Sequence, residues 1–233
     1  MSQMNPLNEF KARSEMLAVS KLAYERGYLC GTEGNFSIRL DERRVLTTPR
    51  GVCKARLSVS DFLVTNLDGD LIGESIKQSK KPSTELAMHL TVYAERPDIR
   101  AVVHAHPETA VAFTVAGIAL DAPILPEAVL ALGAVPVAPY ATPSTSEVSE
   151  SIRELVKTSD CLLLKNHGSL TVGRTIFDAF YLLETLEHYA QTLLISRQLG
   201  KVEALSEEQV QKLFSICSVY GMKPPQSSVK SGK

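Results

Sequence analysis

The sequence lacks the features that mark several large classes of protein. Its four cysteines are far apart and form no CxxC pair, which argues against zinc ribbons, thioredoxin-like motifs and disulfide-rich miniproteins. No apolar run approaches the roughly 18 residues of a transmembrane helix. Residues 1–13 contain no apolar core of a signal peptide. These absences predict a cytoplasmic protein with reduced and mostly buried thiols, at Cys30, Cys53, Cys161 and Cys217.

An excess of charge of one sign is also missing. The chain carries 25 Lys and Arg residues against 26 Asp and Glu residues, for a net charge of −1. Proteins that bind nucleic acid usually present a strongly basic surface, so the composition does not support a nucleic-acid partner. With 233 residues, 44% of them hydrophobic, the chain is long enough to bury a stable core without disulfides or structural metal ions. We therefore expect a globular protein without a nucleic-acid or membrane partner.

Patterns of helices and short strands alternate along the chain. Helices are expected at 8–28, 85–96, 108–116, 145–158, 175–199 and 207–219, with another inside 123–139. Strands are expected at 36–40, 45–48, 63–66, 101–106, 134–138, 161–165 and 169–172. The first three strands are expected to form an antiparallel meander and the last two a hairpin. This interleaving predicts one α/β domain over 1–223, with a disordered tail at 224–233.

Three of the five histidines lie at the ends of apolar strands. His104 and His106 flank one alanine, and the period of two in a strand points both imidazoles to one face. Such a pair can chelate a metal ion, although two core or surface histidines give the same pattern. His167 precedes Gly168, where its ring can face a cleft or cap a turn. Three histidines favour a catalytic zinc with an open fourth position, and Mn or Co also fits this set of ligands.

Glu85 stands in the first turn of the expected helix 85–96, after Ser83 and Thr84 as candidate N-caps. The helix dipole stabilises a carboxylate at this position, so a purely structural role is one interpretation. In the other interpretation, Glu85 is a general base or an exchangeable metal ligand near the histidines. His89, one turn later, and His188, in the long helix, are expected to be packed, hydrogen-bonded side chains rather than ligands.

Three segments can supply groups that bind an anion. Residues 31–35 offer two glycines and backbone N–H groups, Arg50 and Gly51 offer a guanidinium beside flexible backbone, and residues 83–84 offer hydroxyls at a helix N-terminus. Each segment alone is an ordinary turn or cap, and the sequence contains no Walker A or GxGxxG motif. A phosphate pocket is therefore expected only if the fold brings the three segments together.

Four motifs occur in an order that resembles the class II aldolase/adducin family, and most closely its fuculose-phosphate aldolase branch. They are TEGNFS at 32–37, PSTE at 82–85, HAHP at 104–107 and NHG at 166–168. The resemblance covers roughly residues 10–222, and the set is more specific than any single motif. It implies a single-domain three-layer α/β/α sandwich around a largely antiparallel central sheet. It also implies a homotetramer with active sites between subunits.

The resemblance also implies a role for individual residues. The metal ligands would be His104, His106 and His167, joined by Glu85, which binds the metal at rest and acts as acid or base in turnover. The residues implied to hold the substrate phosphate are Gly34, Asn35, Arg50, Gly51, Ser83 and Thr84. Tyr220, in a Tyr-Gly pair, is expected to reach the site of a neighbouring subunit.

Two positions depart from the fuculose-phosphate enzyme. Glu127 stands where that enzyme has a tyrosine from the adjacent subunit that protonates the aldehyde oxygen. Arg50 stands where it has a small hydroxyl residue, and an arginine can pair with a phosphate or with a substrate carboxylate. The identity of the proton donor and of the aldehyde partner therefore stays open.

The implied activity is that of a zinc-dependent class II aldolase acting on a sugar 1-phosphate such as L-fuculose 1-phosphate. The metal would stabilise the enediolate of dihydroxyacetone phosphate, Glu85 would move the proton on carbon, and Glu127 or Tyr220 the proton on the aldehyde oxygen. Decarboxylases and dehydratases of the family keep the triad and remain alternatives. The 4-epimerases rank lower because they carry Asp at the position of Glu85. A noncatalytic, adducin-like oligomerising protein is the alternative of another class, and the intact triad argues against it.

Overall fold

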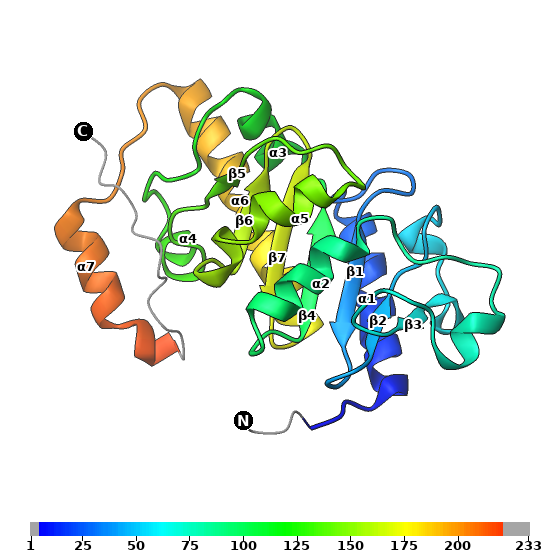
Figure 1. Cartoon of the computed structure of the whole chain (residues 1–233). Helices are drawn as coiled ribbons and strands as arrows, with labels where there is room; N and C mark the ends of the chain where they lie inside the picture. Colours follow the sequence, from blue (N-terminus) through cyan, green and yellow to red (C-terminus); the bar gives the residue numbers. More distant parts are fainter. Residues whose placement is uncertain (1–4, 221–233) are drawn as a thin grey trace.

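A seven-stranded sheet forms the centre of the computed structural model, which describes residues 5–220 apart from the side chain of Tyr220. The strands are ordered β3-β2-β1-β4-β7-β6-β5 (Figure 1). Their bounds are Asn35–Arg39 for β1, Val45–Thr47 for β2, Leu63–Thr65 for β3, Ala101–Ala105 for β4, Val137–Ala138 for β5, Cys161–Leu164 for β6 and Gly168–Gly173 for β7. Every neighbouring pair is antiparallel except β5 and β6. The expected meander, hairpin and largely antiparallel sheet are therefore confirmed.

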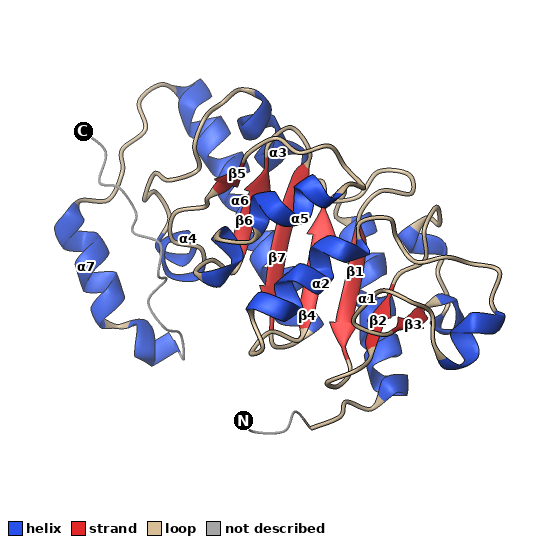
Figure 2. Cartoon of the chain, in the orientation of Figure 1, coloured by secondary structure: helices blue, strands red, loops and turns tan. Residues whose placement is uncertain are grey.

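Helices cover both faces of the sheet (Figure 2). One layer contains α1 (Glu9–Glu25) and α6 (Ile176–Leu199), and the opposite layer contains α2 (Leu86–Glu95) and α5 (Ser146–Ile152). Strand β4 serves both layers because its side chains alternate: Val103 packs into the first core and Val102 into the second. The sandwich of three layers that the sequence predicted is thus the observed architecture.

A third apolar cluster packs against β6, near the β5 edge of the sheet. There α3 (Glu108–Val115) and α4 (Pro126–Ala131) pack on the C-terminal half of α6. Helix α7 (Glu207–Ser215) lies beside α4 and away from the sheet, followed by a short 3-10 turn at Cys217–Tyr220 (Figure 1). No helix in residues 5–220 combines the length and the apolar character that crossing a bilayer requires. The predicted tail at 224–233 lies outside the described residues.

Several elements are shorter than the sequence suggested. Strand β5 has two residues rather than five, because Pro136 and Pro139 flank it and proline has no N–H for a ladder. Helix α5 ends at Ile152, although helix was expected to 158. Helix α2 begins after Glu85, so the prediction that residues 83–84 cap it was wrong by one or two positions. The hydroxyl of Ser83 instead accepts a hydrogen bond from the Glu85 N–H at 3.2 Å.

The four thiols are free but less uniformly buried than expected. Cys161 and Cys217 are buried, whereas Cys53 is half-buried and Cys30 is exposed in the turn before β1. Burial raises the pKa of the Cys161 thiol, which keeps this group protonated in the core. The expectation of mostly buried thiols therefore holds for two cysteines and fails for Cys30.

Candidate metal centre and active site

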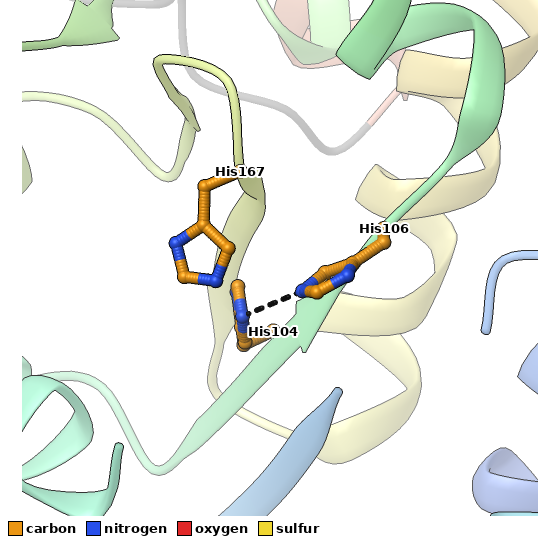
Figure 3. Close-up of side chains that lie close together, drawn as sticks. All are labelled: His104, His106 and His167. Carbon is orange, nitrogen blue, oxygen red and sulfur yellow. Dashed lines mark hydrogen bonds between the residues drawn. The ribbon is translucent and has the colours of Figure 1, made fainter. Parts of the chain in front are cut away.

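Two adjacent antiparallel strands bring the three histidines together. His104 lies on β4, His106 directly follows that strand, and His167 directly precedes β7. Because β4 and β7 pair with Ala105 opposite Ser169, the end of one strand meets the start of the other. The rings lie 4.9 to 5.1 Å apart between centroids and point toward a common centre (Figure 3). One ligand nitrogen from each ring lies within 4.8 Å of the others.

Hydrogen bonds to the outer nitrogens determine the tautomers of two of these rings. His104 Nδ1 lies 2.8 Å from the carbonyl oxygen of Ser169, which can only accept, so Nδ1 carries the hydrogen. His106 Nδ1 donates in the same way to the Glu33 carboxylate at 3.0 Å. In the neutral rings, each Nε2 is then left with a lone pair. Histidines that bind metals are commonly oriented by such bonds to a carbonyl or a carboxylate.

The two free nitrogens fit a shared metal ion. His104 Nε2 and His106 Nε2 are 3.1 Å apart (Figure 3). Nitrogens bound to one tetrahedral zinc at about 2.0–2.1 Å would be about 3.3 Å apart, close to this separation. Burial is the main cause that lowers the pKa of His106 to about 3, and a positive charge on a neighbouring histidine ring would act in the same direction. Its ring is therefore neutral near pH 7 and has a lone pair for a cation.

Glu85 faces the same centre from the start of α2. Its Oε1 lies 3.2 Å from His167 Nε2, and its Oε2 lies 3.4 Å from His104 Nε2. The amide of Asn35 donates a hydrogen bond to Oε2 at 2.9 Å and so orients the carboxylate. Burial by itself would raise the pKa of Glu85, but its contacts with His104 and His167 lower it overall. Glu85 is thus an ionised carboxylate placed to bind a metal or to accept a proton.

Two glycines permit the close approach of the strands at the site. A Cβ on Gly168 would lie 2.6 Å from the carbonyl oxygen of Ala105, 2.7 Å from His106 Cδ2 and 2.9 Å from His104 Cε1. Gly34 has a φ of +69°, and its Cβ would lie 2.9 Å from the carbonyl oxygen of His104. Glycine is needed at both positions because any larger residue would push the histidines apart.

A cavity of about 440 Å³ opens above the histidines. Residues from several segments far apart in the sequence line it, and they include all those predicted to hold a phosphate: Gly34, Asn35, Arg50, Gly51, Ser83 and Thr84. Glu85, His106 and His167 line the same cavity. The fold therefore brings the expected anion-binding groups next to the histidine cluster, which is the condition that the sequence left open.

The structure tests the position of only one of the two residues predicted to move the aldehyde proton. Glu127 is exposed in the first turn of α4 and is not among the lining residues. The side chain of Tyr220 lies outside the described residues. Both residues were assigned by resemblance to a role that a neighbouring subunit would supply, and that role stays a prediction.

The other two histidines differ in their surroundings. His89 is 1% exposed, and its Nδ1 lies 2.7 Å from the hydroxyl of Ser37, as expected for a packed, hydrogen-bonded residue. His188 is exposed on α6, so the expectation that it is packed was wrong. Its position faces away from the core side of α6, whose buried residues include Glu187 and Tyr189.

Sequence reasoning overlooked two charged residues of the site. Glu33 orients His106, and the TEGNFS motif that contains it was noted only for its glycines and its family match. Lys54 lines the cavity with a side chain that is 2% exposed. No pattern in the sequence marks this lysine, because it lies in an irregular segment between two strands.

Comparison with known proteins agrees with this geometry. The family model described as "Class II Aldolase and Adducin N-terminal domain" matches residues 14–194. The chain belongs to this family. It is 33% identical to the 3-oxo-tetronate 4-phosphate decarboxylase of Haemophilus influenzae, over 89% of this chain and 98% of that protein. It is also 33% identical to an L-fuculose phosphate aldolase of Methanococcus maripaludis, over 80% of this chain and 98% of that protein.

A solved structure shows the same fold. The YgbL protein of Klebsiella pneumoniae superposes with a TM-score of 0.80 and 29% identity, over 89% of this chain and 99% of that one. The resemblance seen in the sequence motifs is thus confirmed at the level of family and fold. The two relatives named above are a decarboxylase and an aldolase. Membership of the class II aldolase family therefore does not by itself determine which reaction this protein catalyses.

Proposed function

We propose that the protein is a divalent-metal-dependent lyase that breaks or forms a carbon–carbon bond beside the carbonyl of a small phosphorylated sugar. Its first candidate activity is that of an aldolase on a sugar 1-phosphate such as L-fuculose 1-phosphate. The observation that carries the proposal is the convergence of three imidazoles and Glu85 beneath a cavity lined by anion-binding groups. Zinc suits the ligand set, and Mn or Co would also suit it.

The residues of the site have distinct tasks in this reaction. His104, His106 and His167 would hold the ion. A divalent metal at this place supplies a Lewis acid for the negative charge that develops on the substrate carbonyl oxygen. Glu85 takes a proton from the carbon next to that carbonyl, or returns one, while Asn35 holds its carboxylate in position.

The anion-binding groups of the cavity lining would hold the phosphate. Arg50 supplies positive charge, Ser83 and Thr84 supply hydroxyls, and Gly51 has a positive φ of 69° that leaves its backbone open to a ligand. An anchored phosphate fixes the reacting carbon relative to Glu85, and such positioning contributes strongly to catalysis. A homotetramer in which Tyr220 and Glu127 complete a neighbour's site belongs to the same proposal.

A decarboxylase is the second candidate. It is supported by two cationic residues in one cavity, Arg50 and Lys54, which suit a substrate with both a phosphate and a carboxylate. The name of the Haemophilus influenzae relative points the same way. Loss of CO₂ from a 3-oxo acid phosphate and aldol cleavage of a ketose 1-phosphate both leave the enediolate of a ketone phosphate, so one set of residues can serve either reaction.

A single partial reaction tests the proposal before the substrate is known. Dihydroxyacetone phosphate should exchange a carbon-bound hydrogen with D₂O when the purified, metal-loaded protein is added. We expect about one metal ion per chain, and the His104→Ala variant should lose both the metal and the exchange. The His188→Ala variant, changed at an exposed position on α6, should keep both.

Two outcomes would count against the proposal. A wild-type protein that takes up no divalent metal would leave only the adducin-like, noncatalytic alternative. A protein that binds metal without exchanging hydrogen would move the activity to a different chemistry. Release of dihydroxyacetone phosphate from L-fuculose 1-phosphate would then separate aldolase from decarboxylase, because only the aldolase cleaves that ketose.

A further inference from the structure

Lys54 is a buried cation that makes no direct salt bridge within residues 5–220. Its side chain is 2% exposed, and it begins a 3-10 turn at Lys54–Arg56. Its Nζ donates one hydrogen bond, to the carbonyl oxygen of Thr32 at 2.6 Å, and within residues 5–220 no carboxylate lies within 4.0 Å of it. An ammonium group has three donors, and a buried charge normally requires an opposite charge as partner. Two donors and the charge therefore remain available to a group that enters the cavity.

The ammonium lies near the histidine cluster, because it bonds to Thr32 and the next residue, Glu33, bonds to His106 Nδ1. Its charge interacts with the carboxylates of Glu85 and Glu33 and acts on the ring of His106. Arg50, by contrast, is exposed at the mouth. Desolvation lowers the pKa of Lys54 to about 8, while the nearby carboxylates oppose that change, so the group stays mostly charged at pH 7. The cavity thus presents one cation outside and another close to the reacting carbon.

We propose that Lys54 recognises a carboxylate on the substrate, at the end opposite its phosphate, which makes the substrate a phosphorylated 3-oxo acid. This inference rests on the lyase function proposed above and chooses between its two candidates. With the phosphate among Arg50, Ser83 and Thr84 and the ketone at the histidines, a carboxylate two carbons from the ketone falls at the metal end. A ketose phosphate has no anion there and would leave the ammonium unpaired.

The reaction that follows needs no oxidant or second substrate. The bond between the carboxylate carbon and the neighbouring carbon breaks, and CO₂ leaves. The electron pair stays on that neighbouring carbon, conjugated with the ketone, and a proton that comes from water and is passed on by Glu85 is added there. The products are CO₂ and a ketone phosphate. Lys54 contacts the carboxylate in the bound substrate, so it contributes to substrate affinity and selection more than to the chemical step.

A matched pair of stable ligands tests this role by binding alone. Erythronate 4-phosphate and erythritol 4-phosphate differ only in a carboxylate against a CH₂OH group. By calorimetry on the metal-loaded wild type, we expect the acid to bind about 10- to 100-fold more tightly, as for a buried hydrogen bond to a charged group. The preference should disappear in Lys54→Met. The preference should persist in the control variant Lys81→Met. Lys81 is exposed and does not line the cavity, and only its backbone carbonyl oxygen contacts the site, by accepting a hydrogen bond from the Arg50 N–H.

Kinetics provides a second test that separates this inference from the proposed function. With 3-oxo-tetronate 4-phosphate, Lys54→Met should raise KM about 10- to 100-fold and change kcat less, while hydrogen exchange of dihydroxyacetone phosphate, which has no carboxylate, should fall by a clearly smaller factor than the rise in KM. A wild type with no preference for erythronate 4-phosphate would overturn the role of Lys54, whether or not the variant folds. Equal loss of exchange in Lys54→Met would also overturn it, by making the lysine a phosphate ligand or a structural residue. Absence of exchange in the wild type would refute the lyase function itself.

Discussion

Glu85 combines two properties at the residue scale: its oxygens face two imidazoles, and its orientation is set by one amide. The distances of 3.2 and 3.4 Å to His167 and His104 allow the carboxylate to bind a metal at rest or to accept a proton from a bound substrate. Asn35 holds one oxygen from β1, while the backbone of α2 holds the residue itself. A carboxylate fixed in this way can work as a base without first reorienting.

Replacing that carboxylate should separate proton transfer from metal binding. In Glu85→Gln, the three histidines still supply enough ligands for the ion, but no base remains next to the substrate carbon. We expect hydrogen exchange of dihydroxyacetone phosphate to fall about 100- to 10,000-fold. Metal content measured by mass spectrometry should stay near the wild-type value. The Glu108→Gln variant, changed at an exposed position in α3, should match the wild type in both assays.

A loss of metal in Glu85→Gln would point instead to a carboxylate that the site requires as a permanent ligand. Unchanged exchange would remove Glu85 from the chemistry. The two measurements therefore assign the residue to one role or the other.

At the scale of elements, α6 stabilises the start of α3 through a buried carboxylate. Glu187 is 3% exposed and accepts hydrogen bonds from the N–H groups of Thr109 at 3.0 Å and Ala110 at 2.9 Å. Gln191 donates a further bond to it at 3.0 Å. The first N–H groups of a helix have no partner within the helix, and a negative charge suits this end of the dipole. Because α3 begins at Glu108, two residues after His106, this contact also fixes the chain beside the histidine cluster.

Truncating Glu187 should therefore weaken the fold near the site. In Glu187→Ala, two buried N–H groups lose their acceptor, and we expect the free energy of unfolding to fall by about 1–3 kcal/mol. Urea denaturation would measure this change. Glu184→Ala, on the same helix, removes only a partly exposed ion pair with Arg26 and should cost less than about 1 kcal/mol. Equal losses in the two variants would contradict the capping role.

At the scale of the whole molecule, a buried polar cluster joins the α2 layer to the sheet. The hydroxyl of Ser37 on β1 lies 2.7 Å from His89 Nδ1 and 2.7 Å from the hydroxyl of Tyr93, both on α2. Burial lowers the pKa of His89 to about 3, with a further contribution from the charge of His104. The folded protein therefore keeps this ring neutral, while the unfolded chain protonates it below its ordinary pKa of about 6.5.

This difference predicts how stability depends on pH. Since the folded pKa is depressed, the contribution of His89 is fully present above about pH 6.5 and is lost progressively as the pH falls toward 3, by at most about 1.4 kcal/mol per pH unit. Between pH 6.5 and 5, the wild type should lose up to about 2 kcal/mol more than His89→Gln. Urea titrations with a chelator present would measure this without a contribution from metal release. Parallel losses in the two proteins would contradict it, and His188→Gln should behave as the wild type.

The sequence by itself determined much of the architecture and the core of the site. Apolar residues recur every two positions in a strand and about every 3.6 positions in a helix, and a short stretch of sequence is enough to show either repeat. Most strands and helices were therefore predicted within a few residues. The same period placed His104 and His106 on one face of a strand. The ordered motifs indicated the family, and all six residues expected at the phosphate do line one cavity.

Only the tertiary structure decided which distant segments meet. His104 is held by Ser169, 65 residues away, because β4 pairs with β7, and Glu85 by Asn35, 50 residues away, because α2 packs on β1. Burial of Lys54 and exposure of His188 also depend on neighbours far along the chain. Local propensity acts over a few residues, whereas pairing and burial follow from the packing of the whole sheet and its two helical layers. For this reason the sequence indicated the chemistry of the candidate metal centre, and the fold revealed the buried lysine in the same cavity.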